Sequence, residues 1–77
     1  MLMPEQSRAA RGALAWSQED LAARAKVSLS TVRDFEAGRR MPIANNLGAM
    51  ERAFAEAGIT MTNDGRAVTV AWQLPQA

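Results

Sequence analysis

The 77-residue chain contains no cysteine and no histidine. The absence of cysteine excludes disulfide bridges, thiolate metal sites and thiol nucleophiles, and the absence of histidine excludes an imidazole base or ligand. A chain of this length is expected to form one domain with a small core, which is marginally stable without help. Because disulfides and imidazole or thiolate metal sites are excluded, association with a second subunit is the form of help that remains.

Long apolar segments are also missing. No stretch approaches the roughly 20 apolar residues that a membrane-spanning helix needs. The N-terminal segment Met1 to Glu5 has no basic residue and no long apolar run, which argues against a secretory signal. The lack of cysteine fits a reducing compartment. We therefore expect a cytoplasmic protein.

The net charge is only +1, but the basic residues are unevenly distributed. Seven of the nine lie within the first 40 positions, which they share with five acidic residues. These seven are Arg8, Arg11, Arg24, Lys26, Arg33, Arg39 and Arg40. A positively charged face is possible, but composition alone does not identify a partner.

Caps and apolar spacing predict three short helices in the first half of the chain. Pro4 suits the first turn of a helix over Pro4–Leu14, because proline has a fixed φ and no N–H. Ser17 and Ser28 are good N-cap residues for a second and a third helix, and Gly38 is a natural stop for the third.

The period of the apolar residues changes in the last third of the chain. Helical spacing predicts a fourth helix from Asn45 or Asn46 to Ala57. Alternation of apolar and polar residues around an Asn-Asp-Gly turn then predicts a β-hairpin over Ile59–Gln73.

The segment from Ser17 to Arg40 has the pattern of two short helices joined by a tight turn. Ala22 is small, as required where the second of these helices packs over the first. Apolar residues fill the junction, namely Leu21, Ala25, Val27, Val32 and Phe35. The opposite face of the later helix is polar and consists of Ser30, Arg33, Asp34 and Ala37. Such a face is typical of a helix that enters a DNA groove.

This segment resembles the phage Cro and repressor helix-turn-helix family, also called the XRE family. The matching residues are Gln18, Leu21, Ala22, Val27, Ser28, Ser30, Thr31, Val32, Phe35, Glu36 and Gly38. Together with the patterns above, the resemblance implies a mainly α fold: a four-to-five-helix Cro/repressor-like helix-turn-helix domain with a C-terminal β-hairpin. We expect the helical DNA-binding domain to occupy residues 1–58 and the hairpin and tail to occupy residues 59–77.

The resemblance also implies roles for individual residues. Gln18 would hydrogen-bond a DNA phosphate, helped by the helix N-terminus. The positions that face the major groove would be Ser28, Leu29, Ser30, Arg33 and Asp34. Arg33 is the best candidate to bind a guanine edge with two hydrogen bonds. Thr31 would contact a phosphate or cap the helix, and Arg39 and Arg40 would hold the DNA backbone.

Three further roles follow from the same resemblance. Asp34 would accept a hydrogen bond from a cytosine amino group or orient Arg33. Leu29 would touch a thymine methyl group. Arg11 and Glu36 match a pair that forms an internal ion pair in relatives, joining the first and third helices.

The chain departs from the family at two places. Relatives usually have glycine at the turn position that Lys26 occupies here. A non-glycine residue at positive φ costs about 1 kcal/mol, which the turn should survive. Relatives often have a fifth helix, whereas this chain has a predicted hairpin.

The residues expected to contact DNA can also have ordinary structural roles. Arg33 and Asp34 can form an ordinary solvated helix face. Arg39 and Arg40 can be plain surface charges, and Gln18 can be no more than the first residue of its helix.

Other residues that could suggest a site are interpreted as structural. Carboxylates such as Asp20 and Glu36 have no predicted nucleophile, metal or pocket beside them, so we predict no catalytic residue, metal or cofactor. Arg11 is expected to stabilise the fold rather than contact DNA. Trp16 and Phe54 are expected to cover the core rather than stack on bases.

The hairpin suggests how subunits associate. Val68, Val70 and Trp72 form one apolar face, but a lone hairpin is marginal in water and its second strand has an exposed edge. We therefore hypothesise that two copies pair through their hairpins into a continuous sheet, giving a two-fold homodimer. The alternative is a monomer whose hairpin folds over its own core.

The sequence thus predicts a sequence-specific, double-stranded DNA-binding transcription regulator. The expected form is a dimeric repressor with the helix Ser28–Ala37 in the major groove of an inverted-repeat operator. Activation is an alternative mode. The rival from another class is a protein-interaction module, such as an antitoxin, whose DNA binding would be autoregulatory.

Overall fold

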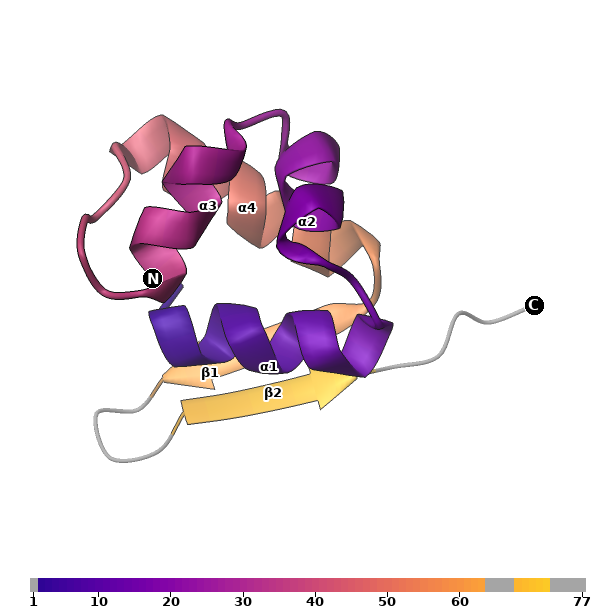
Figure 1. The fold of residues 1–77 in the computed structure, drawn as a ribbon. Coiled ribbons are helices and arrows are strands. Elements are labelled where there is room, and N and C mark those ends of the chain that lie inside the picture. Colours follow the sequence, from indigo (N-terminus) through magenta and orange to yellow (C-terminus); the bar gives the residue numbers. More distant parts are fainter. Residues whose placement is uncertain (1, 64–67, 73–77) are drawn as a thin grey trace.

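The computed structural model describes residues 2–63 and 68–72, and the side chains of residues 2–59. The described part is mainly helical, with one pair of strands (Figure 1). Its elements are α1 (Pro4–Leu14), α2 (Gln18–Ala25), α3 (Leu29–Glu36), α4 (Ala44–Glu56), β1 (Ile59–Asn63) and β2 (Val68–Trp72).

Serine caps set the starts of α2 and α3. The Ser17 hydroxyl accepts a hydrogen bond from the Asp20 main-chain N–H at 3.0 Å, and the Asp20 carboxylate accepts one from the Ser17 N–H at 2.9 Å. This reciprocal pair satisfies two main-chain donors that the first turn leaves open. The Ser28 hydroxyl accepts in the same way from the Thr31 N–H at 3.1 Å.

Helix α4 begins earlier than predicted. Its N-cap is Ile43, which has an extended backbone and makes no side-chain capping bond, and Ala44 is the first helical residue. The prediction of a start at Asn45 or Asn46 is therefore wrong by one or two residues. It relied on the helical spacing of the apolar residues, which does not fix the first turn, and no capping side chain marks the start of the helix here.

Left-handed residues end α1 and α2. Lys26 has a φ of +59° at the turn between α2 and α3, and Ala15 has a φ of +57° after α1. At the first of these turns, the Val27 N–H donates to the Ala22 carbonyl at 3.0 Å. This is the bond that usually accompanies a glycine at the end of a helix, so Lys26 occupies a glycine-type position.

The core lies where the four helices meet. Its buried apolar side chains are Leu2, Ala10, Leu21, Ala22, Ala25, Val32, Phe35, Leu47, Met50, Ala53, Phe54 and Ile59. All the residues expected at the α2–α3 junction belong to this cluster except Val27, which is half-buried and packs against it. Full burial of a side chain such as Phe35 stabilises the fold by about 1.5–3 kcal/mol.

Two aromatic rings cover one side of the core. The Trp16 and Phe54 rings stack with their centroids 5.8 Å apart, and Phe54 is fully buried. The Arg24 guanidinium lies 4.5 Å from the centroid of the Trp16 ring, a cation–π arrangement. The Trp16 ring therefore contacts both Phe54 and Arg24 within the protein.

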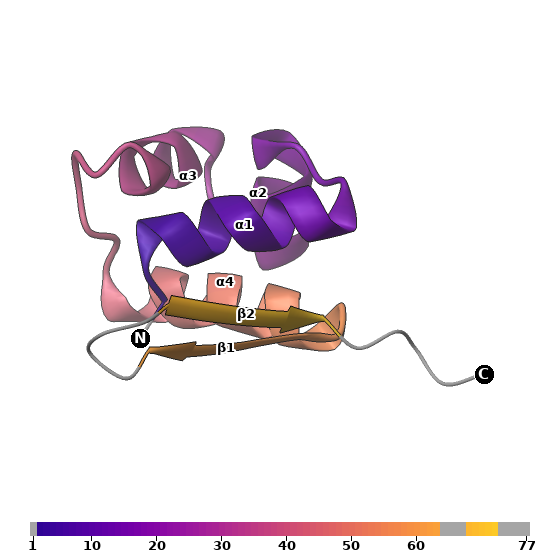
Figure 2. The same ribbon diagram turned by 90° about the horizontal axis from the view of Figure 1, so that it is seen from below.

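The strands β1 and β2 are antiparallel, and their register pairs Ile59 with Trp72 and Met61 with Val70. Strand β2 lies against α1 and β1 lies against α4 (Figure 2). Helix α3 lies on the far side of α1 from the strands (Figure 1). The predicted Asn-Asp-Gly turn, except for its first residue, and the tail after Trp72 lie outside the described residues.

Candidate nucleic-acid interface

Helix α3 has one buried face and one open face. Val32 is 0% exposed and Phe35 is 1% exposed, so the helix is anchored to the core by this side. Ser30 and Arg33, on the other side, are exposed. The sequence assigned these residues to opposite faces, and the structure places them so.

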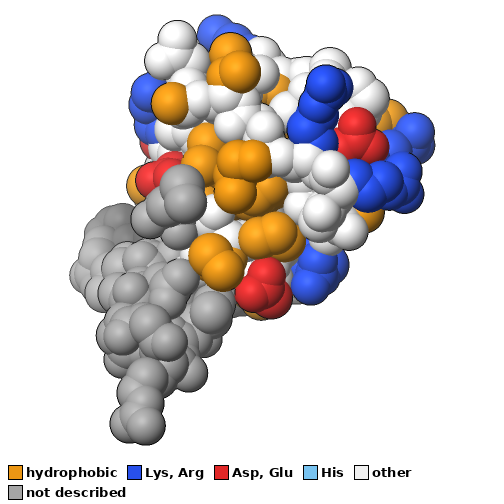
Figure 3. Space-filling model, turned by 90° about the vertical axis from the view of Figure 1, so that its left-hand side faces the viewer, with side chains coloured by type: hydrophobic (Ala, Val, Ile, Leu, Met, Phe, Trp, Pro, Cys, Tyr) orange, Lys and Arg blue, Asp and Glu red, His pale blue; other side chains and the backbone are white. Residues whose placement is uncertain are grey.

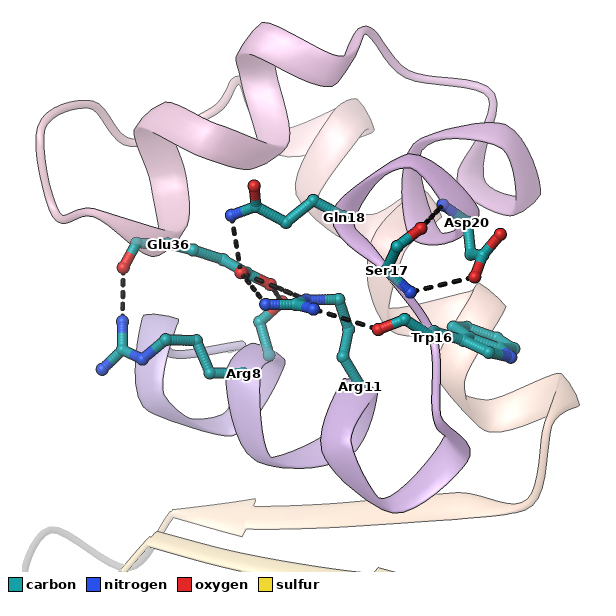
Figure 4. Close-up of polar contacts among 8 residues, drawn as sticks. Arg8, Arg11, Trp16, Ser17, Gln18, Asp20 and Glu36 are labelled. Atoms are coloured by element: carbon teal, nitrogen blue, oxygen red, sulfur yellow. Dashed lines mark hydrogen bonds and ion pairs between the residues drawn. The ribbon is translucent and has the colours of Figure 1, made fainter.

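A buried carboxylate fixes the C-terminal end of α3 (Figure 4). The Glu36 side chain is only 1% exposed and receives the Arg11 guanidinium, with Nη2 2.7 Å from Oε1 and Nε 2.9 Å from Oε2. This two-pronged contact is the strong form of an arginine–carboxylate pair. Arg11 also donates from Nη1 to the Trp16 carbonyl at 3.0 Å. The expected pair of Arg11 and Glu36 is thus brought together.

Two more side chains complete the hydrogen bonds of Glu36. The Ser7 hydroxyl donates to Oε2 at 2.5 Å and the Gln18 amide donates from Nε2 to Oε1 at 3.1 Å. In addition, the Arg8 guanidinium donates from Nη1 to the Glu36 main-chain carbonyl. One residue of α3 is therefore tied to α1 and to the start of α2.

The network also sets protonation. Burial raises the pKa of Glu36. Hydrogen bonds from Arg11, Ser7 and Gln18, together with the charge of Arg11, lower this pKa by more than burial raises it, so the net pKa lies below its usual value. The hydrogen bond to Glu36 raises the pKa of Arg11 against the opposing effect of burial. Both groups are consequently charged at neutral pH.

Gln18, predicted to bind phosphate, is the first residue of α2 and is half-buried. Its amide nitrogen already donates to Glu36, but an amide has two N–H groups and a carbonyl oxygen. Gln18 lines a surface hollow together with Arg33. The network thus holds Gln18 beside α3 without using all of its hydrogen-bonding groups.

Asp34 pairs with Arg39 rather than with Arg33. The Arg39 Nη1 lies 3.6 Å from the Asp34 Oδ1, and these side chains are 73% and 36% exposed, so water screens the pair. The chain turns at Gly38, which has a φ of +74°, and the Arg39 N–H returns to the Asp34 carbonyl at 2.9 Å. Arg39 and the exposed Arg40 therefore stand beside the end of α3.

Hydroxyl groups in the first turn of α3 already contact one another around the N-cap Ser28. The Ser28 hydroxyl lies 2.7 Å from the Thr31 hydroxyl and 3.2 Å from the Ser30 hydroxyl. Leu29 is half-buried and packs against the core, so only part of its side chain faces solvent. Among the predicted groove contacts, Ser30 and Arg33 are the most open.

Two hollows flank the open face of α3. One, of about 420 Å³, lies between α1, the start of α2 and α3, and is lined by Arg8, Arg11, Gln18, Ser30, Arg33, Asp34, Glu36, Ala37 and Arg39. The other, of about 290 Å³, is bounded by α3, the α3–α4 connector and the start of α4, and Arg40 contributes to it. The open face of α3 is therefore a ridge between two depressions.

The connector between α3 and α4 exposes apolar side chains. Met41 is 55% exposed and Ile43 is 68% exposed. Figure 3 shows a face on which hydrophobic side chains gather in the middle and basic ones lie at the borders. Met41, Pro42 and Ile43 of this connector thus line the smaller hollow.

Other site types find no support in the described residues. Among residues 2–63 and 68–72, no helix is long and apolar enough to cross a membrane. In the same part of the chain, no three acidic side chains cluster in a way that could hold a metal ion. The predicted association residues Val68, Val70 and Trp72 belong to β2, but their side chains lie outside the described ones.

The sequence did not predict two of the residues that bind Glu36 and so hold α3 in place. Ser7 is fully buried against Glu36, and Arg8 binds the Glu36 carbonyl. Ser7, Ala10 and Leu14 fall at helical spacing along the first segment, which was the available signal for the first contact. Nothing in the sequence pointed to the second, because it joins residues 28 positions apart through a main-chain atom.

Two short helices joined by a tight turn, the second held with a polar face outward, define a helix-turn-helix protein. A helix-turn-helix family model matches residues 8–62, which is most of the chain. The chain belongs to this family, the XRE family of helix-turn-helix proteins. Membership indicates a DNA-binding transcription regulator. No curated protein sequence matches the chain.

Proposed function

We propose that the protein is a sequence-specific repressor that inserts α3 into the major groove of double-stranded DNA. The observation that carries this proposal is the two-sided character of α3. Its apolar side is locked in the core, whereas Ser30 and Arg33 project from a ridge with no bulky apolar side chain on it. A major groove about 12 Å wide admits one such helix.

Arg33 is the residue that we propose to read sequence. It is exposed at the middle of the ridge, and its expected partner Asp34 is occupied by Arg39 instead. A guanidinium in this position can bind O6 and N7 of a guanine. Ser30, one turn earlier on the same face, would add a shorter contact to a neighbouring base.

The flanking polar residues would position the helix on the DNA backbone. Gln18 and Arg39 lie beside α3 along the larger hollow, and Arg40 borders the smaller one. Contacts of this type fix register without reading sequence. Gln18 would bind phosphate through the amide groups that Glu36 does not use.

Binding measurements with two variants test the division of roles. Arg33→Ala should cost about 1–3 kcal/mol on the preferred sequence and relax the base preference, because a bidentate base contact is lost. Arg39→Ala should weaken binding to all sequences alike. Fluorescence anisotropy with preferred and random duplexes separates these effects.

The matched control for both variants is Arg52→Ala, which removes an exposed arginine of α4 that lines neither hollow. It should bind like the parent apart from a small non-specific loss. If Arg33→Ala and Arg39→Ala also bind like the parent, the proposed interface is wrong.

We also propose that the repressor is a homodimer joined through the hairpin. The sheet has two strands within the described part of the chain, and strands with an open edge are prone to pair with a second copy. Because α3 lies on the far side of α1 from the strands, such pairing would leave both ridges free (Figure 1). A dimer bound to an operator would act by blocking polymerase.

Sedimentation equilibrium at micromolar concentration tests the assembly. We expect a mass about twice that of the 8.3 kDa chain. A single species at the mass of one chain would exclude the dimer, although it would leave the roles of Arg33 and Arg39 open to the binding test above.

A further inference from the structure

The hollow between α1 and α3 has an excess of positive charge that the predicted DNA contacts do not explain. Four arginines and two carboxylates line it. Arg11 and Glu36 neutralise each other at 2.7 Å, and the screened contact of Arg39 with Asp34 is weak. Arg8 and Arg33 remain without a carboxylate partner among the described ion pairs.

Arg8 is exposed, yet its guanidinium is held in place. Its Nη1 donates to the Glu36 main-chain carbonyl at the C-terminal end of α3, which ties the side chain of α1 to the recognition helix (Figure 4). A guanidinium carries five N–H donors in a fixed plane, so this bond leaves donors for a second acceptor. The planar fork matches the oxygens of a phosphate.

The position of Arg8 relative to the ridge decides which phosphate it can reach. Arg8 and Gln18 lie on the same hollow, which opens beside Arg33. A helix in the major groove has one DNA strand on each side of it. With Arg33 directed at the base edges, the hollow therefore faces the backbone of one of these two DNA strands. Duplex phosphates are spaced closely enough along that strand for one to lie over the hollow.

We infer that the hollow is a binding site for one DNA backbone phosphate and that Arg8 is its principal ligand, with Gln18 as its neighbour. This inference rests on the proposed function. It makes α1 part of the DNA interface, although the helix-turn-helix unit itself begins only at α2. The bond to the Glu36 carbonyl orients Arg8, so the hydrogen bonds that hold α3 also hold the phosphate ligand.

The salt dependence of binding tests the assignment. Each neutralised phosphate contributes about 0.9 to the slope of log K against log salt. Arg8→Gln should therefore reduce the magnitude of the slope by about 0.9 and weaken binding about eightfold at roughly 0.1 M salt, equally on preferred and random duplexes. Arg8→Lys, which keeps the charge, should retain the parent slope.

Arg52→Gln is the matched control, because Arg52 is exposed on α4 and does not line the hollow. It should leave the slope unchanged. If Arg8→Gln lowers the melting temperature but leaves the slope at the parent value, Arg8 only caps α3 and the inference is overturned. The Arg33→Ala result is independent of this outcome, so loss of the phosphate site is distinguishable from failure of the proposed function.

A second measurement uses the unaltered chain and does not depend on any variant folding. An arginine-specific dicarbonyl reagent is applied with and without duplex DNA, and the modified residues are identified by mass spectrometry. DNA should reduce modification of Arg8 several-fold and leave Arg52 unchanged. Equal modification of Arg8 in both conditions would contradict the inference.

Discussion

At the scale of single residues, Glu36 organises the contacts between α3, α1 and the start of α2. Its carboxylate accepts hydrogen bonds from Arg11, Ser7 and Gln18, and its carbonyl accepts one from Arg8. Among the described residues, no buried side-chain nitrogen or oxygen lacks a hydrogen-bond partner, which is the condition for a buried charge to be tolerated. The C-terminal end of α3 is tied to α1 and to the start of α2 through this one residue.

We predict that Glu36→Gln lowers the free energy of unfolding by about 3 kcal/mol, the lower end of the range for breaking a buried pair. The lower end applies because Arg11 is 18% exposed and water can partly replace the lost carboxylate. Urea denaturation measures the change. Glu56→Gln, at an exposed position in the last turn of α4, should change stability by less than about 0.5 kcal/mol.

The lowered pKa of Glu36 adds a pH dependence with a defined sign. The contribution of Glu36 to stability is present above its ordinary pKa of 4.5 and is lost as the pH falls below 4.5 toward the lowered folded value. As the pH falls below 4.5, the free energy of unfolding should therefore decline more steeply in the parent than in Glu36→Gln. Parallel curves for the two proteins would contradict the assignment.

These residue-scale contacts were only partly predictable from sequence. The pairing of Arg11 with Glu36 followed from the family resemblance. The sharing of Glu36 with Ser7 and Gln18 did not, because a carboxylate with four acceptor positions can take several donors and spacing does not say which ones. The contact of Asp34 with Arg39 depends on the turn at Gly38, which folds the chain back beside the helix.

At the scale of elements, local sequence signals were sufficient to predict the start of a helix where a capping residue or a proline marks it. The serine caps and the proline placed the starts of α1, α2 and α3 within one residue of the observed ones. Helix α4 has no capping side chain at Ile43, so its start was misplaced. The left-handed ending of α1 at Ala15 was not anticipated either, because alanine carries no signal for positive φ.

The turn between α2 and α3 gives the clearest prediction at this scale. Lys26 has a φ of +59°, where a Cβ atom is unfavourable, so Lys26→Gly should raise the free energy of unfolding by about 1 kcal/mol. DNA affinity should be unchanged, because Lys26 lines neither hollow beside α3. Thermal and urea denaturation provide the measurement.

The control for this prediction is Ala23→Gly, an exposed position within α2 where φ is helical. Glycine there should lower stability by about 1 kcal/mol, because it increases the entropy of the unfolded chain without relieving any strain. If both glycine variants are destabilised, the backbone at Lys26 is not strained as described.

At the scale of the whole molecule, the arrangement separates two surfaces. Helix α3 lies on one side of α1, and the strands lie on the other side (Figure 1). The exposed polar face of α3 was predicted from the sequence, and the role of the strands in association stays a prediction, but the hollow between α1 and α3 was not predicted. That hollow arises from packing of two helices distant in sequence, and no local pattern encodes it.

The most direct test of the central claim is selection of bound duplexes from a random DNA pool, carried out in parallel with the parent chain and Arg33→Ala. For the parent we predict an enriched inverted repeat with half-site centres roughly 34 Å, or a multiple, apart. The Arg33→Ala pool should lose the preference at one base pair of each half-site. Recovery of the same sequence by both proteins, or of no sequence by the parent, would contradict base reading by α3.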